Sequence, residues 1–313
     1  MCNRFLALVG PSGSGKSSVV KAGLIPALRN GMMTNSEHWF YVEMFPGLNP
    51  FEELEAALLR IAINPPDDML EQLMADERGL LKIVDQLLPS DTDTELLLVI
   101  DQFEEVFTQF EDDQLRELFL NSLCVAMENP RSRLRIIITL RADFYDRPLY
   151  FPDFADMFRQ RTEVILPMSR DELHRSIASP AERVGVTMEQ GLVPAILRDI
   201  AEQPGALPLL QYALTELFDR RVGRMLTLKA YQDSGGVLGA LARRADELYR
   251  HLTEAQQAAA KQLFLRMVSL GEGSEDTRRR VRQAELMTIL DEDVLNPVIN
   301  VYGQYRLLTF DRD

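Results

Sequence analysis

The chain has 313 residues, 46% of them hydrophobic and 26% charged, which suits two or three domains with buried cores and excludes a disordered or collagen-like chain. Its net charge of −14 argues against sequence-independent binding to nucleic acid, because a phosphate backbone needs a basic surface. The longest apolar runs fall far short of the ~20 residues that span a bilayer. With only two cysteines and no signal-peptide pattern, we expect a cytoplasmic protein without a membrane span.

The first half of the chain alternates between two patterns. Short apolar runs of β-type residues are separated by segments in which apolar residues recur with a helical period. One helical segment opens with Asn49 at the N-cap and Pro50 at the first helical position. This alternation predicts a mostly parallel sheet with helices on its faces. We expect strands at residues 5–9, 39–45, 96–100, 134–140 and 162–166, and helices at 49–62 and 112–128.

After about residue 167 the strand-like runs stop and helices dominate. Ser169 with Glu172, and Thr253 with Gln256, form the capping pairs that begin two of these helices. Three helices followed by a strand are typical of a winged helix, here cut off within its wing. We expect helices at 169–185, 189–201 (kinked at Pro194), 207–220, 238–251, 253–270, 283–290 and 293–301, and a strand at 305–310.

The segment "GPSGSGKS", residues 10–17, matches the phosphate-binding pattern G-x-x-x-x-G-K-[ST] in full. A buried-type strand precedes it and a helix follows, so backbone N–H groups and the helix N-terminus can surround phosphates. Lys16 would reach the β- and γ-phosphates, and the Ser17 hydroxyl would hold Mg²⁺. The predicted nucleotide-binding residues here are Gly10, Pro11, Ser12, Gly13, Ser14, Gly15, Lys16, Ser17 and Ser18.

An apolar strand in "ELLLVIDQFEE" ends at Asp101, a pattern that delivers one carboxylate to the metal of a bound nucleotide. A second carboxylate just beyond it could orient the attacking water, and Glu104 and Glu105 are both candidates. The alternative is that they only complement the positive end of a helix. Gln102 occupies the position where many P-loop ATPases carry a glutamate.

The next strand in the chain, in "RLRIIITLRADFYDRPL", ends at Arg141. In P-loop ATPases with an inserted strand, this strand lies between the phosphate-loop strand and the acidic strand. That topology would place Arg141 near the γ-phosphate, where a guanidinium distinguishes ATP from ADP. The alternative is a surface arginine at a strand end, and Asp143 could pair with it.

These motifs resemble the STAND class of signal-transduction NTPases, and in particular the bacterial novel STAND family. The more specific features are "DQFEE", "RADFYDRPL" and "GALPLLQYAL", within a resemblance that extends over nearly the whole chain. It implies an α/β P-loop NTPase with a mostly parallel five-stranded sheet, followed by a helical domain and a truncated winged-helix domain. The implied domains are residues 1–167, 168–251 and 252–313.

The resemblance also implies a function and one further contact. In STAND proteins a Gly-x-Pro element packs against the adenine, and its nearest match, "GALPL", has one extra residue between Gly205 and Pro208. Pro208 is therefore the expected adenine contact. The family implies a slow ATP-hydrolysing switch that self-associates in its ATP state, with sensor and effector domains outside this chain. None of the three histidines matches the family's β-phosphate sensor.

Two other functions remain open from the sequence. "GPSGSGKS" also begins guanylate-kinase-like enzymes, so a P-loop kinase of a small molecule is one alternative. A scaffold that holds ADP without hydrolysing it is the other, suggested by Gln102. The basic cluster "TRRRVR", residues 277–282, admits DNA contact, an intramolecular or subunit contact, or a solvated face, and the acidity of the chain argues against DNA.

Overall fold

The computed structural model describes residues 4–89, 94–201, 205, 207–269, 277–278, 281, 283–288, 291–305 and 307–308. The chain divides into two compact units, Met1–Pro167 and Met168–Asp313. Within the described residues, no helix has both the length and the apolar character needed to cross a membrane.

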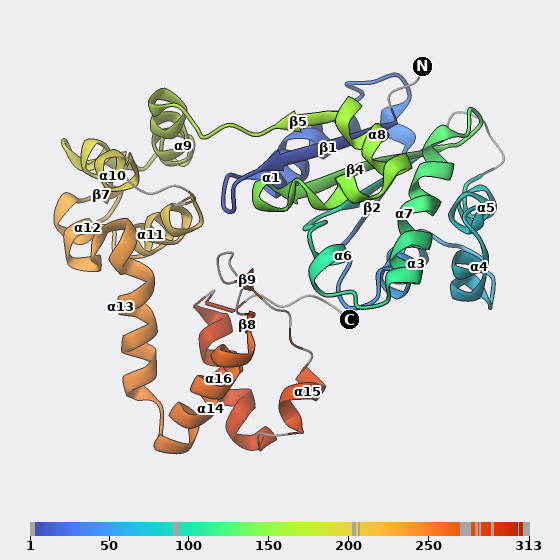
Figure 1. The fold of residues 1–313 in the computed structure, drawn as a ribbon. Helices are drawn as coiled ribbons and strands as arrows, with labels where there is room; N and C mark the ends of the chain where they lie inside the picture. The colour runs from blue at the N-terminus through green and yellow to red at the C-terminus, as the bar shows by residue number, and fades with distance from the viewer. Residues whose placement is uncertain are drawn as a thin grey trace. The chain divides into compact units, whose positions relative to one another are not determined.

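The first unit is built on a five-stranded sheet in the order β2-β3-β4-β1-β5 (Figure 1). Each neighbouring pair of strands is parallel. The predicted α/β fold and its parallel sheet are confirmed, and β4 lies between β1 and β3 as the inserted-strand topology requires. The strands are β1 (Phe5–Gly10), β2 (Phe40–Met44), β3 (Leu96–Ile100), β4 (Leu134–Arg141) and β5 (Thr162–Val164).

Helices cover both faces of this sheet, and successive strand residues alternate between two apolar clusters. In β3, Leu96, Leu98 and Ile100 belong to the larger cluster, and Leu97 and Val99 to the smaller one on the opposite face. A strand buried on both faces explains the unbroken apolar run. The helical elements are α1 (Lys16–Ser18), η1 (Val19–Leu24), α2 (Ile25–Arg29), η2 (Ser36–His38), α3 (Pro50–Leu59), α4 (Met69–Ala75), α5 (Gly79–Leu87), α6 (Glu105–Thr108), α7 (Asp113–Glu128), η3 (Ala142–Phe144), η4 (Arg147–Tyr150) and α8 (Pro152–Gln160).

The second unit is mostly helical, and its two apolar clusters share α13. Val237 and Ala240 of this helix pack in one cluster with α9 to α12, whereas Leu248 packs in the other with α14 to α16. The elements are α9 (Arg170–Arg183), β6 (Thr187–Met188), α10 (Leu192–Ala201), α11 (Leu207–Asp219), β7 (Met225–Leu226), α12 (Leu228–Ser234), α13 (Gly236–His251), α14 (Glu254–Arg266), β8 (Val268–Ser269), β9 (Thr277–Arg278), α15 (Gln283–Met287) and α16 (Glu292–Gln304).

Both predicted capping boxes are present, at Ser169 and at Thr253. The kink expected at Pro194 is not needed. The helix begins at Leu192, so Pro194 lies in its first turn. Backbone N–H groups in the first turn have no partner within the helix, so the proline breaks no helical hydrogen bond there.

The C-terminal expectations are met only in part. In the predicted strand at 305–310, Tyr305, Leu307 and Leu308 are described and belong to no strand, and the other residues lie outside the described part. Most of "TRRRVR" also lies outside it, except Thr277 and Arg278 of β9 and Val281. The division of residues 168–313 into a helical and a winged-helix domain stays a prediction.

Candidate nucleotide-binding site

The predicted phosphate loop joins the end of β1 to the start of α1, at the carboxyl edge of the sheet. Gly13 and Gly15 have φ values of 69° and 92°, in the left-handed region that glycine adopts without strain. Gly10 is closely packed, since a Cβ atom there would lie 2.9 Å from Ser14 Oγ and 3.0 Å from the Ile165 carbonyl oxygen. The loop therefore needs its glycines for backbone shape. Pro11, Ser12 and Ser18 are exposed at its surface.

Lys16 is buried at the first position of α1, with its ammonium folded back over the loop. Its Nζ donates hydrogen bonds of 2.9 Å to the carbonyl oxygens of Gly10 and Pro11. Burial lowers the pKa of this ammonium, and the negative charge of Glu104 opposes that effect. The side chain thus presents a desolvated positive charge at the loop, as phosphate binding requires.

Ser14 supplies an independent sign that the loop is built for a ligand. Among the described residues its Oγ is one of two buried side-chain polar atoms without a hydrogen-bond partner, the other being Arg4 Nε. Buried hydroxyls are nearly always hydrogen-bonded, so one left alone inside a phosphate loop marks a place where a ligand oxygen fits.

Asp101 is the centre of a hydrogen-bonded cluster between three strand ends. Its carboxylate is buried, and Oδ1 accepts hydrogen bonds from Ser17 Oγ at 2.7 Å and from Thr139 Oγ1 at 2.6 Å. Gln102 N donates to Asp101 Oδ1 at 3.2 Å and to Thr139 Oγ1 at 3.0 Å. Ser17 and Asp101, both predicted metal ligands, are therefore brought together. A hydroxyl and a carboxylate are hard oxygen donors that suit Mg²⁺.

Lys21 reaches the other oxygen of the same carboxylate. Its Nζ lies 3.2 Å from Asp101 Oδ2, and it also forms a close ion pair with Glu43. The same ammonium lies 5.0 Å from the centroid of the Phe45 ring. Lys21 and Glu43 were not predicted from the sequence. The available signal was spacing, because Lys21 is one helical turn beyond Ser17 and so lies on the same face.

Glu104 and Glu105 are both buried but face different partners. Glu104 Oε2 accepts the backbone N–H of Arg141 at 3.2 Å, and Glu105 Oε2 accepts that of Gly47 at 3.0 Å. Burial raises the pKa of the Glu104 carboxyl to about 7, against the opposing effects of two backbone hydrogen bonds and of Lys16. Glu104 is therefore the carboxyl that belongs to the phosphate-loop cluster, and Glu105 instead holds the segment that follows β2.

The backbone between these groups turns sharply. Gln102 has a φ of 56°, an uncommon value for a residue other than glycine. Its N–H bonds to Asp101 and Thr139 hold that conformation. Gln102 thus has a conformational role at the position where many P-loop ATPases carry a glutamate.

Arg141 closes the cluster from β4. In the parallel ladder it is the register partner of Gly10, the first residue of the phosphate loop. Its guanidinium donates to Asp143 at 3.1 and 2.6 Å and lies 5.5 Å from the centroid of the Phe144 ring. Its backbone is thus placed beside the loop, while its side chain is paired with Asp143, as the sequence allowed.

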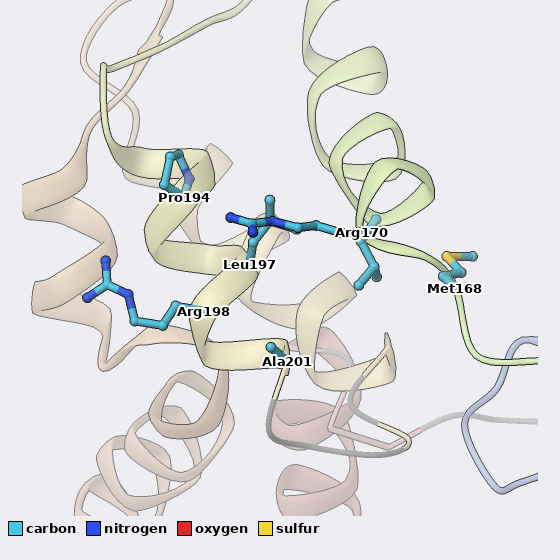
Figure 2. Close-up of a pocket in the computed structure, with 7 residues that line it drawn as sticks. Met168, Arg170, Pro194, Leu197, Arg198 and Ala201 are labelled. Atoms are coloured by element: carbon cyan, nitrogen blue, oxygen red, sulfur yellow. The ribbon is translucent and has the colours of Figure 1, made fainter.

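Pro208, the predicted adenine contact, belongs to the second unit. It is exposed in the first turn of α11, next to Gly205, whose φ is 77°. A hollow of about 520 Å³ opens in the same unit, lined by Met168, Arg170, Leu173, Pro194, Leu197, Arg198 and Ala201. Figure 2 shows the Arg170 side chain extending from the start of α9 toward α10. Pro208 does not line this hollow, and its contact with adenine stays a prediction.

Thr139 is a third residue of the site, after Lys21 and Glu43, that was not predicted from the sequence. It is the one polar side chain in the apolar run "IIITL", and it lies two positions before Arg141 on the same face of β4. A lone hydroxyl inside a strand that is buried on both faces needs a hydrogen-bond partner. This requirement was the sequence signal that could have pointed to Thr139.

Solved structures with a similar fold include the Orc1 protein of Aeropyrum pernix, solved in complex with DNA. It has a TM-score of 0.50 and 15% identity, over 96% of this chain and 77% of that one. Cdc6p of Pyrobaculum aerophilum has a TM-score of 0.49 and 13% identity, over 96% and 74%. At 15% identity, the likeness to the Orc1 protein shows the fold alone. Among curated proteins the chain has no significant match. The family described as Novel STAND NTPase 1 matches residues 1–313, which confirms the predicted resemblance, and the chain belongs to that family.

Proposed function

We propose that this chain binds ATP with Mg²⁺, hydrolyses it slowly, and acts as a signal-transduction switch whose nucleotide state controls domain arrangement and self-association. Membership of the Novel STAND NTPase 1 family implies a nucleotide-binding switch. The observation that carries the finer proposal is the meeting of Lys16, Ser17, Asp101 and Glu104 at one edge of the sheet. Sensor and effector domains would lie outside this chain.

The residues present fit a magnesium nucleotide. The N–H groups of the phosphate loop, the Lys16 ammonium and the orphaned Ser14 hydroxyl suit phosphate oxygens. Ser17 Oγ and the Asp101 carboxylate would hold the metal. When bound, Mg²⁺ and ATP supply the divalent charge and the phosphoanhydride. Catalysis would then rest on positioning and electrostatics.

Glu104 is the carboxyl that we assign to the water. It lies close enough to Lys16 for each charge to affect the other's pKa, whereas the Glu105 carboxylate is bound to Gly47 N. With a pKa of about 7, Glu104 is near the value at which a general base works best at neutral pH. At neutral pH only part of the protein carries Glu104 in its ionised form. This favours the slow turnover that a switch needs.

Arg141 is proposed to sense the γ-phosphate. Arg141 is the register partner of Gly10, and its guanidinium is held by Asp143. Exchange of Asp143 for a phosphate oxygen would give this arginine a response to ATP that it does not have to ADP. Pro208 is proposed to cover the adenine. The charge of −14 leads us to expect no binding to nucleic acid.

The test uses ATP labelled at the γ-phosphate and the full chain. We expect slow phosphate release without any acceptor and a different oligomeric mass with a non-hydrolysable ATP analogue than with ADP. Arg141→Ala should bind ATP but show one mass with both nucleotides. Phosphoryl transfer that depends on an added small-molecule acceptor would identify a kinase instead, and bound ADP without turnover would identify a scaffold.

A further inference from the structure

Asp101 is surrounded by donors that differ greatly in freedom to move. Ser17, Thr139 and the Gln102 N–H all reach Oδ1 from short side chains or backbone at the strand ends. Lys21 reaches Oδ2 instead, from a long side chain that is 39% exposed. A carboxylate offers about four acceptor positions, so these contacts nearly fill it.

A metal ion bound by Ser17 and Asp101 would therefore compete with the positively charged Lys21 side chain. The Lys21 ammonium is 3.2 Å from Asp101 Oδ2, and a divalent ion bound to the same carboxylate would repel it. Lys21 has a second position available, because Glu43 already forms an ion pair with it and Phe45 lies beneath it. Glu43 lies in β2 and Phe45 directly follows that strand. Strand β2 neighbours β3 on the side away from β4.

We propose that Lys21 is a built-in counter-ion of the metal site: it neutralises Asp101 when no metal is bound and yields to Mg²⁺ by withdrawing to Glu43. The proposal rests on the assignment of Ser17 and Asp101 as metal ligands in the proposed function. Lys21 is then a positioning residue that acts through Asp101. Without metal, Lys21 keeps the Asp101 carboxylate aligned with Ser17. Its competition with the metal sets the Mg²⁺ concentration at which the site is half-saturated.

The competition predicts opposite effects for its two partners. Lys21→Met keeps the length of the side chain and removes the charge, so Mg²⁺ should bind about tenfold more tightly. Glu43→Gln removes the second position, so Lys21 stays on Asp101 and Mg²⁺ should bind more weakly. The double variant should behave like Lys21→Met, because Glu43 acts only through Lys21. Lys21→Arg is the matched control and should stay within about threefold of the wild type.

Two readouts separate this proposal from the proposed function. The first is the shift of the thermal unfolding midpoint of nucleotide-free protein during titration with Mg²⁺ alone. The second is the Mg²⁺ concentration that half-saturates binding of a fluorescent ADP analogue. If the analogue does not bind the wild type, the proposed function fails, while the midpoint titration still measures the Lys21 contact.

Opposite shifts in Lys21→Met and Glu43→Gln support the proposal. Weaker Mg²⁺ binding in Lys21→Met would show that Lys21 only holds Asp101 in position, and this result would overturn the proposal. Equal Mg²⁺ dependence in all variants would also overturn it, as would the absence of any Mg²⁺ effect in Lys21→Met with and without nucleotide. If Lys21→Met fails to fold, Mg²⁺ binding by Glu43→Gln decides between the two explanations. A merely structural ion pair between Lys21 and Glu43 predicts no loss of Mg²⁺ affinity in Glu43→Gln.

Discussion

The Ser17 hydroxyl donates a 2.7 Å hydrogen bond to Asp101 Oδ1, across 84 positions of sequence. Ser17 lies in α1, which follows β1, and Asp101 directly follows β3. These two strands are not neighbours, because β4 lies between them. Thr139 on β4 fills that gap and donates to the same oxygen at 2.6 Å. Hydrogen bonds between protein groups thus hold the proposed metal-binding pair together, and Thr139 joins its two halves.

Replacement of Thr139 by valine should therefore destabilise the protein. Valine keeps the shape but leaves the buried Asp101 oxygen and the Gln102 N–H each without one partner. We expect a loss of about 1–3 kcal/mol in the free energy of unfolding, measured by denaturant titration. Thr139→Ser retains the hydroxyl and should lose only about 1 kcal/mol, for the missing methyl group. Equal losses in the two variants would show that the hydroxyl does not matter.

The raised pKa of Glu104 makes stability depend on pH in a defined direction. Burial raises the pKa from its ordinary value of 4.5 to about 7, so between these values the folded protein keeps a proton that the unfolded chain loses. The free energy of unfolding should fall as pH rises through this window, by on the order of 3 kcal/mol from this one group, and should change little from it above the window. Glu104→Gln should remove this contribution, as the difference between the two proteins' stability curves would show. A pH-independent difference would contradict the buried, protonated carboxyl.

Glu104 and Glu105 form a matched pair for testing catalysis. Glu104→Gln should retain ATP binding and lower single-turnover hydrolysis by about 10²–10⁴-fold, since glutamine cannot accept the water proton. Glu105→Gln changes a carboxylate that is bound to Gly47 N, so hydrolysis should stay within a few-fold of the wild type. Measured against pH, wild-type turnover should rise through about 7 as Glu104 ionises. The reverse ranking of the two variants would assign the water to Glu105.

A second buried charge holds the helical unit together. Glu216 on α11 accepts hydrogen bonds from Arg244 on α13 at 2.6 and 3.3 Å, with Arg220 3.5 Å away, and Arg244 also lies 4.9 Å from the centroid of the Tyr305 ring. Arg244→Met should lower the free energy of unfolding by about 2–4 kcal/mol, because it leaves a buried carboxylate with a weaker partner. Glu216→Leu combined with Arg244→Met should recover part of that loss in a double-mutant cycle. Strict additivity would show that the pair is not coupled.

The sequence predicted the framework of the site better than its details. The five strands and the glycine loop follow from local sequence patterns. The position of β4 follows from the inserted-strand topology of P-loop ATPases, so all of these could be predicted from the sequence. Helices α4, α5 and α8 were missed, although Pro152 at the first position of α8 is a start signal.

The choice between Glu104 and Glu105 could not be predicted, because adjacent residues differ only in which distant N–H each one meets. Arg141 supplies that N–H for Glu104, and Gly47 for Glu105, from opposite sides of β3. For Lys21 the sequence offered only its spacing from Ser17, because its partners Glu43 and Asp101 come from β2 and from the end of β3.

Nucleotide affinity with and without the Lys16 ammonium tests the central claim most directly. Lys16 is held over the loop by the Gly10 and Pro11 carbonyl oxygens, so Lys16→Ala removes the positive charge together with these two hydrogen bonds. Titration calorimetry with Mg²⁺ and ATP should show one site per wild-type chain and a loss of at least about tenfold in the variant, as expected for a charge-assisted hydrogen bond. An unchanged ATP affinity in Lys16→Ala would contradict the assignment of residues 10–18 as the nucleotide site.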